Sequence, residues 1–228
     1  MENKKIIVPT VSNHYLNLLD PEELESFNSH FDQLGRPCAV DKRSWMDYPE
    51  RPEVSVRIAS SDEYLFVKFH IREREVLGRF KKDNEPVYLD SCVEIFLSPQ
   101  GSNYYYNFEF NCLGTCLAQV GTDRNNREYI GSEILEGISR IPSLGQQSCC
   151  IYSEGVLEEA KPWSLLVAIP VQCFVRDDFE TLSGQKFRGN FYKCGDDLSL
   201  PHYLSWNKIE TEYPDFHRPE FFGEIWIS

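Results

Sequence analysis

The feature that most constrains the fold of this chain is a two-residue hydrophobic period, which begins near residue 54 and recurs towards the C-terminus. Within residues 64–71, Leu65 and Val67 share one face of an extended segment, whereas Lys68 and His70 share the other. Similar runs occupy residues 54–58, 92–97, 104–112, 115–120, 163–169, 187–194 and 222–227. Gly, Pro, Asn and Asp separate these runs, which is typical of strands joined by tight turns. The sequence therefore predicts an all-β fold, an antiparallel β-sandwich of the jelly-roll or immunoglobulin type.

One strong helical signal precedes the strands. Asp20 can cap a helix that starts at Pro21, and apolar residues follow at the three- and four-residue spacing of a helix face until Gly35 offers a stop. We predict this helix at about 21–34 within an N-terminal extension, residues 1–40. Short peripheral helices are also expected, one of them within residues 132–141. No linker or repeat interrupts the chain, so we expect a single domain over residues 1–228.

The balance of charge excludes several classes of partner. With 23 Lys and Arg against 36 Asp and Glu, the chain of 228 residues carries a formal net charge of −13. Nucleic-acid binding depends on cations that contact phosphates, so we expect no nucleic-acid partner, and an anionic membrane surface would repel the chain. The longest clean apolar run, residues 165–171, contains Pro170 and is far shorter than the ~20 residues of a membrane-spanning helix.

The eight cysteines bear on the redox state and the cellular compartment. They are Cys38, Cys92, Cys112, Cys116, Cys149, Cys150, Cys173 and Cys194. Several lie in apolar strand patterns and no CxxC pair exists, so we expect buried free thiols, with a disulfide framework as the alternative. The N-terminal segment lacks the apolar region of a signal peptide, which favours the cytoplasm, or a secreted or periplasmic location if a signal peptide has been removed.

Polar side chains follow the second face of the predicted strands. They are Arg57, Lys68, His70, Glu94, Asn107, Glu109, Asn111, Arg188, Asn190 and Tyr192. Charges of both signs mixed with amides form a dense set of donors and acceptors, which suits the hydroxyl groups of sugars. Aromatic rings can pack on the apolar faces of sugars, and loop-like segments hold Trp45, Tyr48, Tyr203 and Trp206. The alternative interpretation is a solvated sheet face or a buried ion-pair network.

Signals for catalysis and cofactors are weaker. Glu94 and Glu109 could form the carboxylate pair of a glycoside hydrolase, which is the alternative function to binding. No HExxH, GxSxG or GxxxxGK[ST] motif occurs, so the common zinc, serine-hydrolase and phosphate-binding sites are not predicted. Haem, which related sandwiches bind, needs axial His or Met ligands, and the only methionines are Met1 and Met46.

Several segments in chain order resemble a known family. They are residues 90–99 (DSCVEIFLSP), 105–114 (YYNFEFNCLG), 163–170, 190–195 (NFYKCG), 205–206 and 216–223 (FHRPEFFG). Together they resemble the family 9 carbohydrate-binding modules, particularly stand-alone family 9-like proteins of gut and environmental bacteria. The resemblance implies a β-sandwich that binds glucan- or xylan-derived sugars without cleaving them. It also implies two tryptophans that grip the reducing end of a sugar chain, and structural calcium.

The residues and the resemblance combine into one predicted site without a catalytic residue. Its ligand-binding residues are Trp45, Arg57, Lys68, His70, Glu94, Glu109, Asn111, Arg188, Asn190 and Trp206, with Trp45 and Trp206 as the stacking platforms. Calcium is an open alternative, because Asp123, Asp196 and Asp197 could contribute oxygen ligands but form no EF-hand loop. The expected partners are an oligosaccharide or polysaccharide of the xylan or cellulose type and a glycoside hydrolase, and we expect a monomer.

Overall fold

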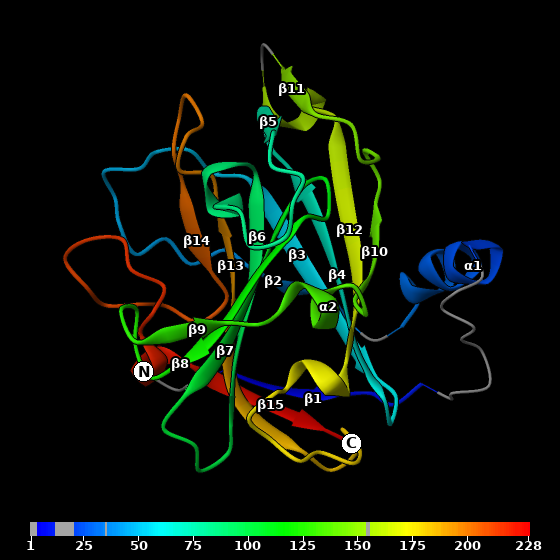
Figure 1. Cartoon of the computed structure of the whole chain (residues 1–228). Helices are drawn as coiled ribbons and strands as arrows, with labels where there is room; N and C mark the ends of the chain where they lie inside the picture. Colours follow the sequence, from blue (N-terminus) through cyan, green and yellow to red (C-terminus); the bar gives the residue numbers. More distant parts are fainter. Residues whose placement is uncertain (1–3, 12–20, 35, 154–155) are drawn as a thin grey trace.

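A computed structural model describes residues 4–11, 21–34, 36–153 and 156–228 and shows two β-sheets packed face to face (Figure 1). The larger sheet holds, in spatial order, β1 (Lys5–Val8), β15 (Gly223–Ile227), β13 (Lys186–Cys194), β6 (Cys92–Pro99), β7 (Tyr105–Asn111), β8 (Cys116–Gly121) and β9 (Arg127–Tyr129), and β14 (Tyr203–Ser205) pairs with β13. The smaller sheet holds β10 (Ser139–Pro142), β12 (Pro162–Pro170), β4 (Tyr64–Arg72), β3 (Glu53–Ser60) and β2 (Cys38–Ala39). Every strand pairing in these sheets is antiparallel except that of β1 with β15. The predicted antiparallel β-sandwich is therefore confirmed.

Short elements complete the sandwich. β5 (Glu75–Gly78) and β11 (Cys149–Tyr152) form a separate two-stranded ribbon at one end of it. The helices are α1 (Pro21–Phe31) and α2 (Ser132–Leu135), and the 3-10 turns are η2 (Val87–Leu89), η3 (Leu157–Glu159), η4 (Val171–Cys173) and η5 (Pro219–Phe221). The helix predicted at 21–34 is present but ends at Phe31. The helix predicted within 132–141 has only four residues, because Ser139–Pro142 pairs with β12 as β10 instead.

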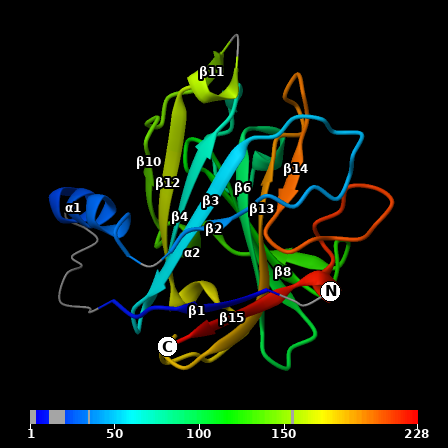
Figure 2. The same ribbon diagram turned by 180° about the vertical axis from the view of Figure 1, so that it is seen from behind.

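Helix α1 packs on the outer face of the smaller sheet, as the view from behind shows (Figure 2). Phe27 and Phe31 of the helix lie against Phe66 of β4, and the ring centroids of Phe27 and Phe66 are 4.9 Å apart. Phe66 points away from the inter-sheet core, so the helix covers an aromatic side chain that would otherwise face water.

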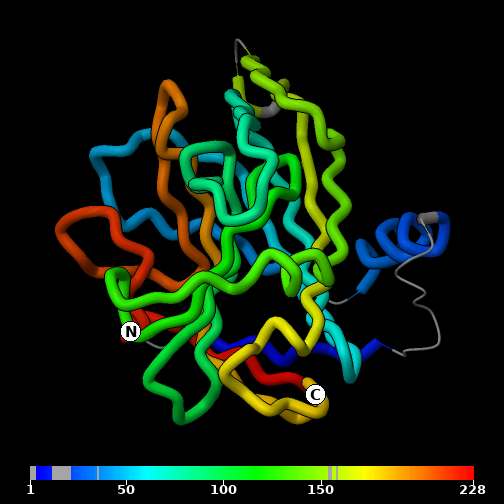
Figure 3. Tube along the Cα trace, viewed as in Figure 1, coloured from blue at the N-terminus to red at the C-terminus, as the bar shows by residue number. Residues whose placement is uncertain are grey.

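The two terminal strands close one side of the larger sheet. β1 runs parallel to β15, with Lys5 opposite Glu224 and Val8 opposite Ile227. Figure 3 shows these two segments, from opposite ends of the chain, running along each other. β1 therefore covers the edge of β15 that would otherwise present unpaired backbone groups.

The two-residue period explains the core between the sheets. Val67 and Phe69 of β4 meet Ile95 of β6 and Phe191 of β13, and all four are fully buried in one cluster. The rings of Phe69 and Phe191 pack edge to face across the two sheets, with centroids 6.3 Å apart. Burying each such side chain stabilises the fold by about 1.5–3 kcal/mol.

Two further expectations from the sequence concern thiols and membrane spans. All eight cysteines are free, although the Sγ atoms of Cys112 and Cys149 lie only 3.9 Å apart. Within the described ranges, no helix is long and apolar enough to cross a membrane.

A buried ion pair fastens β13 to the smaller sheet. Lys193 Nζ lies 2.7 Å from Glu73 Oε2, and both side chains are excluded from solvent. Trp163 of β12 donates its indole N–H to Glu73 Oε1 at 2.8 Å, and His202 lies 2.9 Å from Lys193 Nζ. Burial, and then the Lys193 charge, lower the pKa of His202 far below its ordinary value, so His202 is neutral and Glu73 alone balances Lys193.

The substitution Glu73→Gln should therefore destabilise the protein strongly. Removing one partner leaves the Lys193 charge buried without compensation, which costs about 3–5 kcal/mol. The measurement is the free energy of unfolding in urea. The matched control is Glu128→Gln, which removes the exposed ion pair with Arg176 and should cost less than about 1 kcal/mol. Equal losses in the two variants would contradict the role given to Glu73.

Candidate functional site

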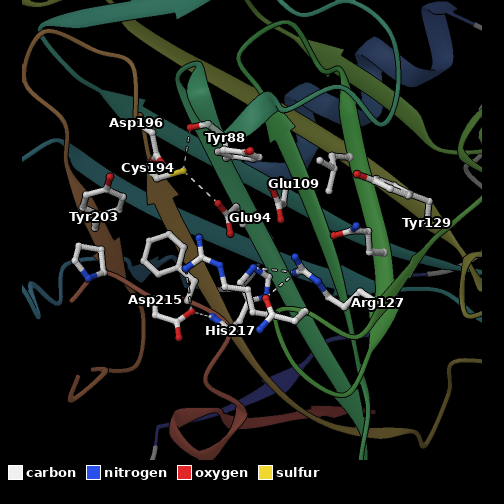
Figure 4. Close-up of a pocket in the computed structure, with 16 residues that line it drawn as sticks. Tyr88, Glu94, Glu109, Arg127, Tyr129, Cys194, Asp196, Tyr203, Asp215 and His217 are labelled. Atoms are coloured by element: carbon white, nitrogen blue, oxygen red, sulfur yellow. Dashed lines mark hydrogen bonds and ion pairs between the residues drawn. The ribbon is translucent and has the colours of Figure 1, made fainter. Parts of the chain in front are cut away.

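A pocket of about 300 Å³ opens on the outer face of the larger sheet (Figure 4). Its floor comes from β6, β7, β8 and the end of β13, and its walls come from β9, β14 and the segments around residues 124 and 215. The lining residues are Tyr88, Glu94, Glu109, Leu117, Gln119, Arg124, Asn125, Arg127, Tyr129, Cys194, Asp196, Tyr203, Pro214, Asp215, Phe216 and His217.

Strand register explains why two carboxylates meet at the floor. Glu94 of β6 stands directly opposite Glu109 of β7, while their neighbours Val93 and Ile95 point into the core. Side chains directly opposite each other in an antiparallel pair have Cβ atoms about 5 Å apart. The same alternation that builds the core thus presents the two glutamates side by side in the pocket.

An aromatic cluster on the same outer face forms one wall. Phe216 stacks on Tyr192 of β13 with ring centroids 4.2 Å apart, and Trp45 packs edge to face against Tyr203. The indole N–H of Trp45 donates to the carbonyl of Thr211 at 3.0 Å. These contacts hold the segment 211–217 over the sheet, so the outer face is a partly roofed pocket and not an open surface.

Arg127 and His217 form a second part of the pocket wall. Arg127 Nη1 lies 2.7 Å from His217 Nδ1, and the Tyr105 hydroxyl lies 2.9 Å from the same ring nitrogen. Burial, and then the Arg127 charge, lower the pKa of His217 to about 2, so this histidine is neutral at physiological pH. Arg127 therefore brings a positive charge to the pocket that neutral His217 does not share, and Figure 4 shows the two side chains together below the glutamates.

Acid groups on the floor hold protons unusually well. Burial, and then the charge of Glu109, raise the pKa of Glu94 well above its ordinary value, and Cys194 Sγ donates to Glu94 Oε1 at 3.2 Å. Burial also raises the pKa of Glu109 to about 7, against the opposing effect of Arg127. Burial raises the pKa of Asp196 to about 6. Near neutral pH the floor therefore offers both hydrogen-bond donors and acceptors.

Tyrosine rings, and not tryptophans, stand at the rim. Tyr88 is 38% exposed and Tyr129 is 61% exposed. Figure 4 shows Tyr129 and Tyr203 on opposite sides of Glu94 and Glu109, with Tyr88 beside them. Such rings can pack on the apolar face of a ligand.

The sequence-based expectation of one shared polar face was wrong for three residues, which lie on the other sheet. Lys68 and His70 contact Asp32, which follows α1, at 2.8 and 2.7 Å. Arg57 donates to the carbonyl of Leu34 at 3.1 Å. These side chains hold the helical segment in place on the far side of the sandwich from the pocket.

Two predicted amides have structural partners. Asn111 donates to the carbonyl of Phe80 at 2.9 Å and to Asp90 at 3.0 Å. Asn190 donates to the carbonyl of Asn207 at 2.9 Å. Both amides are fully buried, and neither lines the pocket, so they fix loops that surround it.

The stacking role expected for two tryptophans does not fit their burial. Trp206 is 3% exposed and packs against Phe191 in the core between the sheets. Trp45 is 6% exposed and stands behind the pocket wall. Arg188 is exposed but donates to the carbonyl of Pro219 at 2.7 Å, outside this pocket.

Among the described residues, the group of side chains that could hold a metal ion consists of two thiols and one carboxylate, whereas calcium prefers oxygen ligands. Cys92, Glu94 and Cys194 place their ligand atoms within 4.8 Å of one another. However, burial raises the pKa of the Cys92 thiol, and the hydrogen bond with Cys92, followed by burial, raises the pKa of the Cys194 thiol. The aspartates considered for calcium have separate surroundings: Asp197 pairs with Arg79, Asp123 bonds within its own turn, and Asp196 lines the pocket. They therefore do not fit a common calcium site.

Sequence reasoning missed the pocket residues of β9. Arg127 and Tyr129 lie in a three-residue strand within a polar connection, and so short a strand shows no period. His217 falls in the segment 216–223 that carries the family resemblance, which was the available signal for it.

Comparisons with known proteins agree with the fold. The sequence profile of carbohydrate-binding family 9 matches residues 30–227. A Bacteroides uniformis protein, to which carbohydrate binding has been provisionally ascribed, is 35% identical with a TM-score of 0.86, covering 100% of both chains. A family 9 carbohydrate-binding module from Caldicellulosiruptor kristjanssonii, solved with glucose and with cellotriose, is 14% identical with TM-scores of 0.56 and 0.54. These matches cover 99% of this chain and 96% and 94% of the module, and at this identity they show the fold alone. No curated protein matches the sequence.

The raised pKa of Glu109 predicts how stability depends on pH. The folded protein keeps a proton that the unfolded chain releases between pH 4.5 and about 7, so this group makes the free energy of unfolding fall as pH rises through that window. The variant Glu109→Gln removes this titration. The free energy of unfolding of Glu109→Gln should equal that of the wild type near pH 4.5 and exceed it by up to about 3 kcal/mol at about pH 8.

Urea unfolding of both proteins across this pH range measures the effect. The control variant Glu128→Gln replaces an exposed glutamate of the neighbouring β9, and its free energy of unfolding should fall with pH as that of the wild type does. Parallel pH profiles of the wild type and Glu109→Gln would contradict a proton held on Glu109.

Proposed function

The chain belongs to carbohydrate-binding family 9, and we propose that it binds an oligosaccharide or the end of a polysaccharide, without cleaving it, in the pocket over β6 and β7. The observation that carries this proposal is a single pocket in which tyrosine rings surround a floor of carboxyl groups. A floor of polar groups and a rim of rings correspond to the two surfaces of a sugar, which are hydroxyl groups at the edge of the ring and C–H groups on its faces.

The floor suits hydroxyl groups because each hydroxyl both donates and accepts hydrogen bonds. Protonated Glu94 can donate, while Arg127 and Gln119 bring further donors to the same space. Glu109 and Asp196 change from donor to acceptor as they ionise near pH 6–7. A neutral sugar therefore finds both kinds of partner in the pocket without needing a charge of its own.

The rim supplies the apolar contact. Tyr129 is largely exposed, and Tyr88 is partly exposed on the adjoining side of the pocket. Ring stacking adds about 0.5–1.5 kcal/mol beyond the area that it buries. In this chain tyrosines take the role that the family resemblance assigned to tryptophans.

Glucose-based sugars are the first ligands to test. The structurally similar module from C. kristjanssonii was solved with glucose and with cellotriose, and both molecules fit the chemistry of the pocket floor. The sequence resemblance adds xylan-derived sugars. A monomer that works beside a glycoside hydrolase is part of this proposal.

Hydrolysis by Glu94 and Glu109 is the competing function, and the elevated pKa of Glu109 is what favours it. A glycoside hydrolase places its two carboxyl groups on either side of the scissile bond. Here both glutamates stand side by side on the floor of one sheet, so a sugar in the pocket meets them from the same side. This arrangement favours binding over cleavage.

Loss of a rim tyrosine should weaken sugar binding. We expect the wild type to bind cellotriose and Tyr129→Ala to bind it about three- to tenfold more weakly, since stacking contributes about 0.5–1.5 kcal/mol. Arg127→Ala should weaken binding at least as much, because it removes a cation and hydrogen-bond donor of the pocket wall. Isothermal titration with glucose, cellotriose and xylotriose provides the measurement.

The control for these variants is Tyr213→Ala. Tyr213 is 71% exposed and lies close in sequence to the wall, but it does not line the pocket. It should bind sugar as the wild type does. The proposal fails if no sugar in the panel binds, if Tyr129→Ala binds normally, or if incubated cellotriose is cleaved.

A further inference from the structure

A second, smaller pocket of about 170 Å³ lies at the other end of β13, beside β15. It is lined by Gln100, Lys186, Phe187, Arg188, Glu220, Phe222, Glu224 and Trp226. In the strand order, β15 lies on the opposite side of β13 from β6, so the pocket is near the edge of the larger sheet away from β9. None of its lining residues belongs to the first pocket.

Trp226 supplies an aromatic surface there. It alternates with the core residues Ile225 and Ile227, so its ring faces outward from β15. Trp226 is half-buried, whereas Trp45, Trp163 and Trp206 are buried. The Nζ atoms of Lys5 and Lys186 lie 2.9 and 4.3 Å from the centre of its ring. Both lysines are exposed, so either ammonium can move off the ring when a ligand packs against it.

The charges around Trp226 do not cancel. Glu224 pairs with Lys5 and Glu220 pairs with Arg218, which leaves Lys186 and Arg188. Among the described residues, neither of these two cations has a carboxylate within 4.0 Å, and the Arg188 guanidinium donates to the carbonyl of Pro219. On a chain of net charge −13, this is a local excess of positive charge beside an aromatic ring.

We propose that this second pocket binds an acidic saccharide unit, with the sugar ring packed on Trp226 and its carboxylate paired with Lys186 and Arg188. A ring face accepts the C–H surface of a sugar, and guanidinium and ammonium groups are the partners of a carboxylate. A neutral sugar would leave the two cations without an ion-pair partner, whereas a uronic acid supplies one, so the pocket favours uronic acids. Arg188, predicted from the sequence to bind ligand, takes that role here and not in the first pocket.

The two pockets are independent sites on one face of the sheet. Arg188 and Cys194 are six residues apart on β13, which corresponds to about 20 Å along a strand. Different residues of the C-terminal segment border the two pockets: Phe216 borders the first, whereas Phe222 and the turn η5 lie beside the second. A sugar chain that carries uronic acid units could therefore engage either pocket alone, and failure of one site leaves the other testable.

Titration with trigalacturonate tests the second pocket directly. We expect wild-type protein to bind it, Lys186→Gln to bind about three- to fivefold more weakly, and Trp226→Ala about tenfold more weakly. Added salt should weaken binding. Tyr129→Ala should not change this affinity, and Lys186→Gln should leave cellotriose binding unchanged. Lys186 is exposed, so its substitution tests the site even if Trp226→Ala disturbs the fold.

Tryptophan fluorescence identifies the site that is occupied. Trp226 is the tryptophan open to acrylamide quenching, since the other three are buried and none lines the first pocket. Trigalacturonate should protect the wild type against quenching, and cellotriose should not. The proposal is overturned if trigalacturonate does not bind, if Lys186→Gln binds it normally, or if Tyr129→Ala abolishes its binding.

Discussion

The register of β6 between β13 and β7 is the constraint on which the rest of the structure depends. It sets Ile95 opposite Phe108 and Phe191 in the core, and Glu94 opposite Glu109 and Tyr192 on the outer face. A slip by one residue would exchange the two sets, because side chains alternate strictly along a strand. Core and pocket are thus two consequences of one pairing, and the burial of the core secures the position of the carboxyl groups.

The outer face of the larger sheet becomes a site because other segments cover it. Phe216 stacks on Tyr192, and Trp45 supports Phe216 from behind while it hydrogen-bonds the carbonyl of Thr211. This cover removes water from around the two glutamates, which is why their pKa values rise. The energy of burying the aromatic rings offsets the cost of holding acid groups out of water.

Polar residues on strands serve two different purposes in this molecule. On the larger sheet they line a pocket, whereas on the smaller sheet Lys68 and His70 contact Asp32 and so fasten α1. The patterns along the strands are alike, so alternation cannot tell these purposes apart. Lys193 shows a third outcome, since its charge faces inward and is matched by Glu73 between the sheets. Only the element packed against each face decides which outcome applies.

The sequence by itself determined the fold class, the main strands, the early helix and the outward direction of Glu94 and Glu109, because these follow from local period and chain order. It did not determine which sheet each strand joins, so Arg57 and Glu94 were expected on one face and lie on two. It also could not show that Trp206 turns into the core, or that Arg127, Tyr129 and His217 converge over the glutamates. Those placements depend on contacts between residues far apart in the chain, which the tertiary structure alone decides.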